Sequence, residues 1–241
     1  MIWIIGGTSD AQKIADYLTA NHKKVLVSTT TPYGAQLAKS GKVTVIQKAL
    51  NLNDMVQLIN DYSINTIIDA SHPFAQDVSK NGMEAALATG VKYLRFEREN
   101  IHFNSAKYFE SYNDIIEYLK NSDGNILLTI GSKNIDLFAQ VGINRITAKV
   151  LPVADSINLC NKAGLKAHQI LACKGILNTQ TNKALLTEYN IKYMVTKDSG
   201  AEGGMIEKIN AANQLNVEVL ILKRPQLNYP VVFNDMGQIE I

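Results

Sequence analysis

The chain has 241 residues, of which 46% are hydrophobic and 19% charged, and its formal net charge at pH 7 is +2. This length fits one large α/β domain or two small ones, and the composition is that of an ordinary soluble globular protein. The small net charge gives no argument for nucleic acid binding. No apolar run approaches the length of a membrane span, and the first apolar segment is too short for a signal peptide.

The two cysteines, Cys160 and Cys173, have no close-spaced partner, so neither a disulfide framework nor a thiolate metal site is indicated. No pair of histidines has metal-ligand spacing either, and we expect no bound metal. We therefore expect a cytoplasmic protein that is a monomer or a small homo-oligomer, with no nucleic acid or membrane partner.

Short apolar strands alternate with amphipathic helices over the first hundred residues. Strands are predicted at residues 2–5, 25–27, 43–46, 66–68 and 93–96. The first helix is predicted to be capped by Ser9 or Asp10. A second is predicted over residues 32–41 with Pro32 in its first turn, a third around residues 55–59, and a fourth over residues 73–90 beginning at Pro73.

The alternation breaks over residues 97–111, which we interpret as a crossing between two halves, and then resumes. Further strands are predicted at residues 126–130, 145–150, 168–172, 193–196 and 217–222, and Pro225 is expected to end the regular part. One of the helices between them is capped by Thr181 or Asn182. Such alternation predicts parallel sheets covered on both faces. The expected architecture is two Rossmann-like, doubly wound halves facing across a cleft, residues 1–97 and 98–241, with the crossing near residues 98–111.

Polar loops follow most of these predicted strands, where open parallel sheets bind their ligands. The richest loop follows residues 193–196 and contains Lys197, Asp198, Ser199 and Gly200. Its cation, hydroxyl and glycine backbone can bind an anion. Lys133, between Gly131 and a helix start, suits a phosphate or a carboxylate.

The loop after the first strand has the position of a dinucleotide-binding turn. It contains Gly6, Gly7, Thr8 and Ser9 but lacks the third glycine of the G-x-G-x-x-G pattern, so a simple tight turn explains it equally well. The second strand ends in hydroxyl residues, Ser28 and Thr29, rather than in an acidic residue. Because a carboxylate at that place reads the ribose of NAD, its absence favours NADPH, with NADH still possible.

Two further residues stand at strand ends. His72 either starts a helix with Pro73 or donates a proton in a ligand site. Arg95 lies inside an apolar strand end, where it could grip a carboxylate, with Glu97 as its ion-pair partner.

These loops, taken in order, resemble the precorrin-6A reductase family of cobalamin biosynthesis, including its cobalt-precorrin-6A branch. The specific blocks are Ser71-His72-Pro73-Phe74-Ala75 and Thr196-Lys197-Asp198-Ser199-Gly200, and further matching segments run along the whole chain. The chain departs from the family pattern at Asp10, where relatives often have glutamate, and over residues 172–177.

The resemblance implies an oxidoreductase that uses NAD(P)H to reduce one double bond of a corrin-type macrocycle, between two Rossmann-like halves. On this basis the dinucleotide is expected at one group of residues: Gly6, Gly7, Thr8, Ser9, Ser28 and Thr29. The tetrapyrrole is expected at a second group: Arg95, Lys133, Lys197, Ser199 and Gly200. His72 and Asp198 are the candidate proton donors, and the roles of the two halves could be reversed.

Two other functions fit a sheet of this type. One is a methyltransferase with S-adenosylmethionine at the glycine turn, which the lack of an acidic residue after the second strand argues against. The other is a non-catalytic dinucleotide sensor, which would not need polar strand ends in the second half. Binding of S-adenosylmethionine, or of NADPH without turnover, would identify them.

Overall fold

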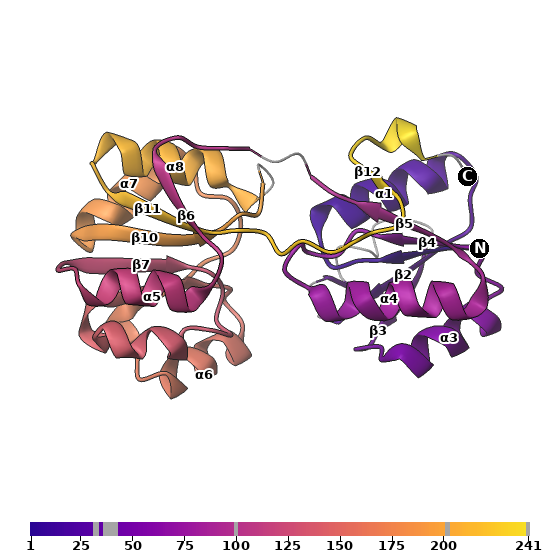
Figure 1. Cartoon of the computed structure of the whole chain (residues 1–241), viewed down its shortest axis with the longest axis horizontal. Coiled ribbons are helices and arrows are strands. Elements are labelled where there is room, and N and C mark those ends of the chain that lie inside the picture. Colours follow the sequence, from indigo (N-terminus) through magenta and orange to yellow (C-terminus); the bar gives the residue numbers. More distant parts are fainter. Residues whose placement is uncertain (31–33, 36–42, 99–100, 201–202, 240–241) are drawn as a thin grey trace. The chain divides into compact units, whose positions relative to one another are not determined.

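The computed structural model describes residues 1–30, 34–35, 43–98, 101–200 and 203–239, and it divides the chain into two compact units (Figure 1). Unit 1 contains Met1–Glu99 together with Pro225–Ile241, and unit 2 contains Asn100–Arg224. The expected division at residues 97 and 98 falls close to the observed one. The second half ends earlier than expected, however, because the C-terminal segment returns to the first unit.

Unit 1 is a six-stranded parallel sheet with helices on both faces. Its strands are β1 (Ile2–Ile5), β2 (Val25–Thr29), β3 (Thr44–Gln47), β4 (Thr66–Asp69), β5 (Lys92–Phe96) and β12 (Val232–Phe233). Its helices are α1 (Ser9–Ala20), α3 (Leu52–Asp61) and α4 (Gln76–Thr89), and a 3₁₀ turn, η5, covers Met236–Gln238. The strand order is β12-β5-β4-β1-β2-β3. This is the order of the doubly wound dinucleotide-binding fold, with β12 in the sixth place, and it confirms the predicted fold class.

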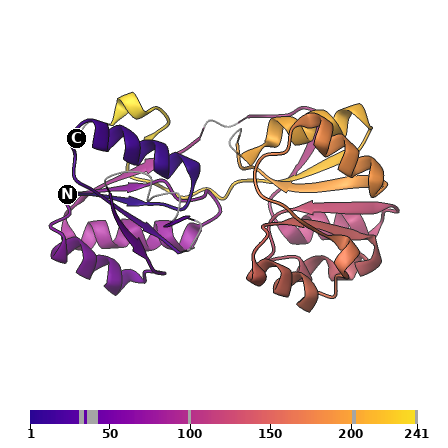
Figure 2. The ribbon, with the colours of Figure 1, turned by 180° about the vertical axis from the view of Figure 1, so that it is seen from behind.

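Alternation along β1 explains how both faces of the sheet are covered. Ile2 and Ile4 pack in a cluster with residues of α1, whereas Trp3 and Ile5 pack in a second cluster with residues of α3 and α4. Successive side chains of a strand point to opposite faces, so a strand that is apolar throughout must be buried on both. Figure 2 shows the same arrangement from behind, with α1 on one face of the sheet and α3 and α4 on the other.

One predicted helix of unit 1 begins later than expected, and another falls largely in a part of the chain that the structure does not describe. Helix α4 begins at Gln76 rather than at Pro73, and it ends as predicted at Gly90, whose φ of 72° is left-handed. The helix predicted over residues 32–41 falls largely outside the described residues.

Unit 2 is a second six-stranded parallel sheet. Its strands are β6 (Ala106–Phe109), β7 (Asn125–Thr129), β8 (Ile146–Val150), β9 (Ile170–Ala172), β10 (Ile191–Lys197) and β11 (Glu218–Leu222). Its helices are α5 (Tyr112–Lys120), α6 (Ala154–Lys162), α7 (Thr179–Glu188) and α8 (Met205–Gln214), with 3₁₀ turns η1 (Asp136–Val141), η2 (Ile143–Arg145) and η3 (Ala167–Gln169). The strand order is β6-β11-β10-β7-β8-β9.

Two local features of unit 2 were predicted wrongly. The segment interpreted as a crossing contains β6, which pairs in parallel with β11 at the edge of the sheet. Helix α7 is capped by Asn178, whose side chain accepts from the Thr181 N–H at 2.8 Å, rather than by Thr181 or Asn182. Helices α7 and α8 pack on one face of the sheet and α5 lies on the other (Figure 1).

The C-terminal segment completes the first sheet rather than ending the regular structure at Pro225. Val232 pairs with Arg95 and Phe233 with Phe96, and the rings of Phe96 and Phe233 meet edge to face at 5.4 Å. Burial of Phe233 against the α1 face of the sheet supplies the energy that keeps this two-residue strand in place.

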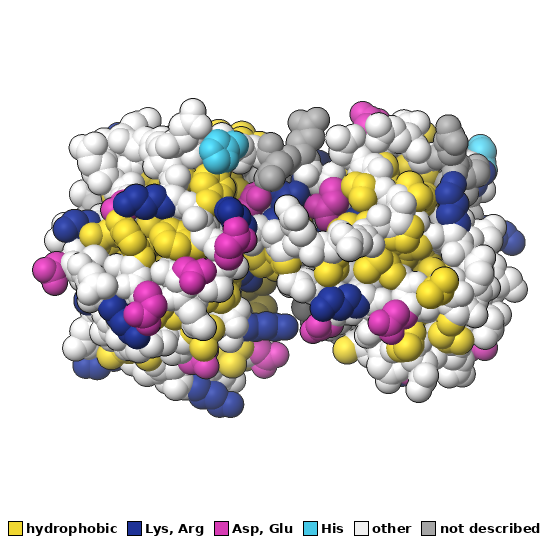
Figure 3. All heavy atoms as spheres, viewed as in Figure 1, with side chains coloured by type: hydrophobic (Ala, Val, Ile, Leu, Met, Phe, Trp, Pro, Cys, Tyr) yellow, Lys and Arg dark blue, Asp and Glu magenta, His cyan; other side chains and the backbone are white. Residues whose placement is uncertain are grey.

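The surface carries charges of both signs. Figure 3 shows basic and acidic side chains interspersed over the visible face of the molecule, as the small net charge implies. Among the described residues, no helix combines the length and hydropathy that a membrane span requires.

Candidate functional site

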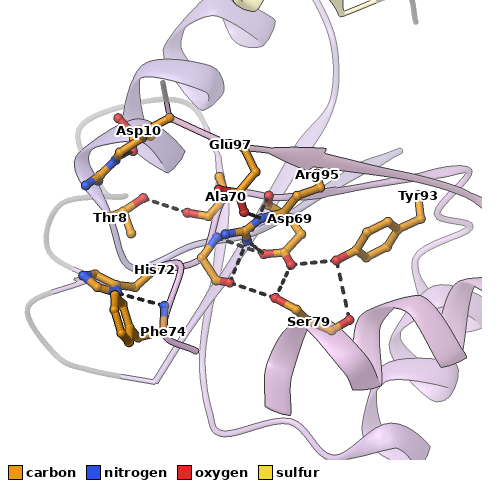
Figure 4. Close-up of polar contacts among 12 residues, drawn as sticks. Thr8, Asp10, Asp69, Ala70, His72, Phe74, Ser79, Tyr93, Arg95 and Glu97 are labelled. Atoms are coloured by element: carbon orange, nitrogen blue, oxygen red, sulfur yellow. Dashed lines mark hydrogen bonds and ion pairs between the residues drawn. The ribbon is translucent and has the colours of Figure 1, made fainter. Parts of the chain in front are cut away.

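The strand order of unit 1 reverses between β1 and β4, and open α/β sheets bind ligands outside the carboxyl ends of the strands at such a point. Thr8, which follows β1, joins the two loops there. Its hydroxyl donates to the Ala70 carbonyl at 2.8 Å (Figure 4). The same hydroxyl accepts from the Ala11 N–H at 3.1 Å. Thr8 is therefore the N-cap of α1, in place of the predicted Ser9 or Asp10.

The two glycines before Thr8 are needed for different reasons. A Cβ on Gly6 would lie 2.8 Å from Val27 Cγ1 and 3.1 Å from the Ser28 carbonyl oxygen, so glycine allows the turn to pack on β2. Gly7 has a φ of 102°, which L side chains rarely adopt, and a Cβ there would meet only Thr29 Oγ1, at 3.5 Å. Gly7 thus exposes backbone beside the hydroxyl of Thr29 at the N-terminus of α1, a kind of place where proteins can bind anions.

Ser28 and Thr29, grouped together in the sequence, have different surroundings. The Ser28 hydroxyl is buried and accepts a hydrogen bond from the indole N–H of Trp3 at 2.9 Å. The Thr29 hydroxyl lies next to Gly7. Both residues are buried, and Ser28 contacts the glycine turn only through its carbonyl, which accepts from the Gly6 N–H at 2.8 Å, so of the two hydroxyls only that of Thr29 lies beside the turn.

A buried ionic network lies beneath the loop after β4. Asp69 is fully buried, and its carboxylate forms an ion pair with the Arg95 guanidinium at 2.9 Å. The carboxylate also accepts from the hydroxyls of Ser79 and Tyr93, each at 2.6 Å (Figure 4). The backbone N–H of Ser71 donates to the same carboxylate at 2.9 Å. The network therefore fixes the start of the loop that Thr8 contacts.

Arg95 belongs wholly to this network. Its side chain is 1% exposed, and it binds Glu97 at 2.8 Å and the Ser71 hydroxyl at 3.1 Å in addition to Asp69. Burial would lower the pKa of Arg95, but the charges of Asp69 and Glu97 outweigh it and raise the pKa. The structure gives this guanidinium a role inside unit 1 in place of the expected contact with a substrate carboxylate.

Two tyrosines extend the network. Burial, and then the negative charge of Asp69, raises the pKa of Tyr93 far above its usual range, so its hydroxyl stays protonated as a donor. The guanidinium of Arg95 lies over the ring of Tyr229 at 5.1 Å, which ties the C-terminal segment to the same cluster.

His72 stands at the carboxyl end of β4, exposed on the loop that the network supports. Its Nδ1 accepts a hydrogen bond from the Phe74 N–H at 3.2 Å (Figure 4). This contact fixes the neutral tautomer in which Nε2 carries the proton, so the ring can present Nε2–H as a donor. His72 therefore does not start the helix, because α4 begins at Gln76 with Ala75 as its N-cap, and its role as a proton donor stays a prediction.

Asp10, in the first turn of α1, forms a largely buried ion pair with Arg98. The pair neutralises the only acidic side chain in this turn. The shorter carboxylate that distinguishes this chain from the family pattern therefore has a partner within unit 1.

In unit 2 the strand order reverses between β7 and β10, and the loops after these strands contain the remaining predicted residues. Lys133 is exposed after β7, and Lys197 is half-buried at the end of β10. Burial, and then the positive charge of Lys133, lowers the pKa of Lys197. The fold thus brings these two cations to one edge.

The residues after Lys197 are more enclosed than the sequence suggested. Ser199 is buried, and its hydroxyl would lie 1.8 Å from a Cβ on Gly203, so glycine is required there for close packing. Gly200 has a left-handed φ of 71°. Asp198, a candidate proton donor, is 4% exposed and forms an ion pair with Arg224 at 3.2 Å. The next two residues, 201 and 202, lie outside the described residues.

Sequence reasoning missed the partners that hold the site. Asp69 directly follows the strand predicted at residues 66–68, but nothing in the sequence indicated that Ser79 and Tyr93 donate to it or that the ring of Tyr229 lies against Arg95. Among the described residues, no group of three or more histidine, cysteine or acidic side chains is arranged to hold a metal ion.

Comparisons with known proteins give a consistent result. The family model described as precorrin-6x reductase CbiJ/CobK matches residues 1–240. The cobalt-precorrin-6A reductase of Methanococcus maripaludis is 32% identical over 99% of this chain and 96% of its own length. That of Methanocaldococcus jannaschii is 33% identical over 98% of this chain and 95% of its own.

Among solved structures, the precorrin-6A reductase CobK superposes with a TM-score of 0.78 at 18% identity, covering 98% of this chain and 93% of that one. This likeness concerns the fold. The family match covers nearly the whole chain, and it replaces the methyltransferase and sensor alternatives. The chain therefore belongs to the precorrin-6x reductase family, a family of oxidoreductases in cobalamin biosynthesis.

Proposed function

We propose that this chain reduces one double bond of cobalt-precorrin-6A, with NADPH as the reductant, to give cobalt-precorrin-6B. The observation that carries the proposal is the switch point of unit 1, where a glycine turn, a helix N-terminus and the Thr29 hydroxyl form a dinucleotide cradle in a member of a reductase family. The cobalt form is favoured because several relatives that match over nearly the whole chain carry that name.

The residues of unit 1 fit a bound dinucleotide. The backbone at Gly7 is open to a pyrophosphate, and Thr8 holds the turn by its bonds to Ala70 and Ala11. The end of β2 carries hydroxyl residues, of which Thr29 lies buried beside Gly7, and no carboxylate, which supports NADPH over NADH. When bound, the nicotinamide supplies the hydride, so the protein has to position two ligands and to exclude water.

The proton that accompanies the hydride needs a donor, and we propose His72 for this role. Its Nδ1 accepts from the Phe74 N–H, and the exposed loop that carries it stands at the switch point of unit 1. Asp198 is a poorer candidate because its carboxylate is buried and paired with Arg224. A general acid of this kind contributes about 10²–10⁴-fold in rate.

On the substrate side, we propose that Lys133 and Lys197 bind carboxylates of the tetrapyrrole, while Ser199 and Gly200 shape the loop that follows Lys197. The cleft expected between the halves stays a prediction. Hydride transfer requires that the two ligands touch, so a ternary complex is the state in which it can be tested.

The experiment is anaerobic turnover of the purified chain with NADPH or NADH, offered cobalt-precorrin-6A and precorrin-6A in parallel. The readouts are the macrocycle absorbance and a mass gain of two hydrogens. We expect the fastest reaction with cobalt-precorrin-6A and NADPH. If NADPH binds and neither macrocycle gains two hydrogens, the proposed function is wrong.

Variants then test the cofactor side with a matched pair on one strand. Thr29→Val should raise the KM for NADPH roughly tenfold, whereas Ser28→Ala should leave it unchanged, because Ser28 bonds to Trp3 in the core. An equal effect of both substitutions on NADPH binding would contradict the placement of the dinucleotide. For the proton, His72→Ala should lower kcat, and an unchanged kcat would remove His72 from the chemistry.

A further inference from the structure

Unit 2 contains a buried lysine, Lys208, that has no role in the proposed reaction as described above. Lys208 lies in the first turns of α8, is 8% exposed, and donates one hydrogen bond, from Nζ to the Thr196 hydroxyl at 3.1 Å. Among the described residues, no carboxylate lies within 4.0 Å of this ammonium group. A buried ammonium with one neutral acceptor is unfavourable, because it has lost its hydration without gaining a counter-ion.

The nearest charges make the position less favourable still. Burial first, and the positive charge of Lys149 on β8 second, lower the pKa of Lys208 to about 8, and the negative charge of Glu207 on α8 opposes them only in part. A cation in the first turn of a helix also meets the positive end of the helix dipole. Lys197 and Lys133 repel each other in the same way. The four lysines, together the lysine cluster, thus form two pairs, and in each pair the positive charge of one lysine lowers the pKa of the more buried one.

The register of the strands brings this lysine cluster to the carboxyl edge of the sheet of unit 2. Thr196 pairs with Thr129 at the carboxyl ends of β10 and β7, the two strands between which the order reverses. Lys149 follows Ala148, which pairs with Leu128 on β7, so it lies at the same level of the sheet as Thr129. Lys208 contacts this row from α8, and Lys197 continues β10 beyond it. The cluster thus occupies the place where a parallel sheet binds its ligand.

We propose that the junction of β7 and β10 is a carboxylate-binding site in which Lys133 and Lys197 contact the anion. Lys208 is a positioning residue in this site: it acts through Thr196 and supplies positive charge from the interior. This deepens the proposed function, on which it rests, by assigning a carboxylate of the tetrapyrrole to unit 2. Binding of one carboxylate supplies the counter-ion that the buried ammonium lacks, so affinity depends on the protonation of Lys208.

The test uses the full-length chain with a porphyrin octacarboxylate as a non-reacting probe, alongside cobalt-precorrin-6A turnover. Lys208→Met removes the charge, Lys208→Arg keeps it, and Lys162→Met removes an exposed charge from the end of α6 as a control. We expect Lys208→Met to weaken probe binding and raise the KM for the macrocycle about tenfold, with Lys208→Arg close to wild type and Lys162→Met unchanged.

The pH profile supplies a readout that a merely structural role would not change. Wild-type affinity for the probe should fall as pH rises through about 8, where Lys208 loses its proton. This fall should be smaller in Lys208→Met, in which Lys197, whose pKa is also lowered, still titrates. Equal probe affinity and an equal pH profile in wild type and Lys208→Met would overturn the proposal.

Two further arms separate this proposal from the proposed function. If Lys208→Met weakens NADPH instead of the porphyrin, the anion at this edge is a dinucleotide phosphate and the carboxylate assignment is wrong. If wild type binds the porphyrin in a Lys208-dependent way but reduces neither precorrin, the carboxylate site stands and the proposed function fails.

Discussion

Replacement of Arg95 by methionine separates the role that the structure gives this residue from the one that the sequence suggested. Asp69 would remain fully buried without the guanidinium that now lies 2.9 Å from it. Removing one partner of a buried ion pair costs about 3–5 kcal/mol, because the other charge is left uncompensated. The hydroxyls of Ser79 and Tyr93 still donate to Asp69. We therefore expect the low end of this range, about 3 kcal/mol, for the loss of stability of unit 1.

The chain offers a direct probe of this unit. Its one tryptophan, Trp3, is fully buried in unit 1, so urea unfolding followed by tryptophan fluorescence reports on unit 1. The Asp69→Asn, Arg95→Met double variant removes both charges and should be destabilised by less than the sum of the single variants. The reasoning is refuted if Arg95→Met unfolds at the wild-type urea concentration and raises only the KM for the macrocycle.

Three further changes test other parts of the structure. Folding lowers the pKa of Lys208 from its ordinary 10.5 to about 8, which corresponds to a loss of about 3 kcal/mol of folding stability. The hydrogen bond to Thr196 offsets about 1 kcal/mol of this loss. Lys208→Met should therefore stabilise unit 2 by about 2 kcal/mol near pH 7. Between these two pKa values the unfolded chain binds more protons than the folded one, so the stability of the wild type should rise to that of the variant as pH increases from about 8 to 10.5. Urea titrations followed by circular dichroism would detect this rise. Gly7→Ala should destabilise unit 1 by about 1–2 kcal/mol through its φ of 102° and weaken NADPH binding in calorimetry. Gly203→Ala should displace the Ser199 hydroxyl, which would otherwise lie 1.8 Å from the new Cβ, and should thereby lower kcat/KM for the macrocycle. Unchanged kinetics would show that this loop is not part of the site.

Much of the fold could be predicted because each strand is apolar throughout and each helix has an apolar face. Ile2 to Ile5 are buried on both sides, and such runs have one interpretation when helices separate them. The errors fell where burial is partial. Strand β6 lies at a sheet edge within a charged and aromatic stretch, so its pattern resembled a connection. Strand β12 has only two residues and depends on pairing with a strand more than a hundred positions away.

The positions of the strand-end loops could also be predicted, but not the inward or outward direction of their side chains. Ser28 and Thr29 are adjacent and chemically alike, yet one bonds to Trp3 in the core and the other lies beside Gly7. Arg95 looked like a ligand because a cation in an apolar strand needs an anion. The sequence indicated Glu97 as an ion-pair partner, and the structure confirms it, but the sequence could not tell that Asp69 provides the buried carboxylate, since the approach of Asp69 depends on the register between β4 and β5.

The balance of charge at the two switch points bears on which unit receives which ligand. In unit 1 the ionic groups near the loops are neutralised internally, Arg95 by Asp69 and Glu97 and Arg98 by Asp10, which leaves glycine backbone and hydroxyls. In unit 2 the lysines near β7 and β10 repel one another. A dinucleotide pyrophosphate can be held by backbone N–H groups, whereas a macrocycle with several carboxylates needs cations spread over an edge. The charge distribution therefore favours the dinucleotide on unit 1 and the tetrapyrrole on unit 2, and it predicts that added salt weakens macrocycle binding more steeply than NADPH binding.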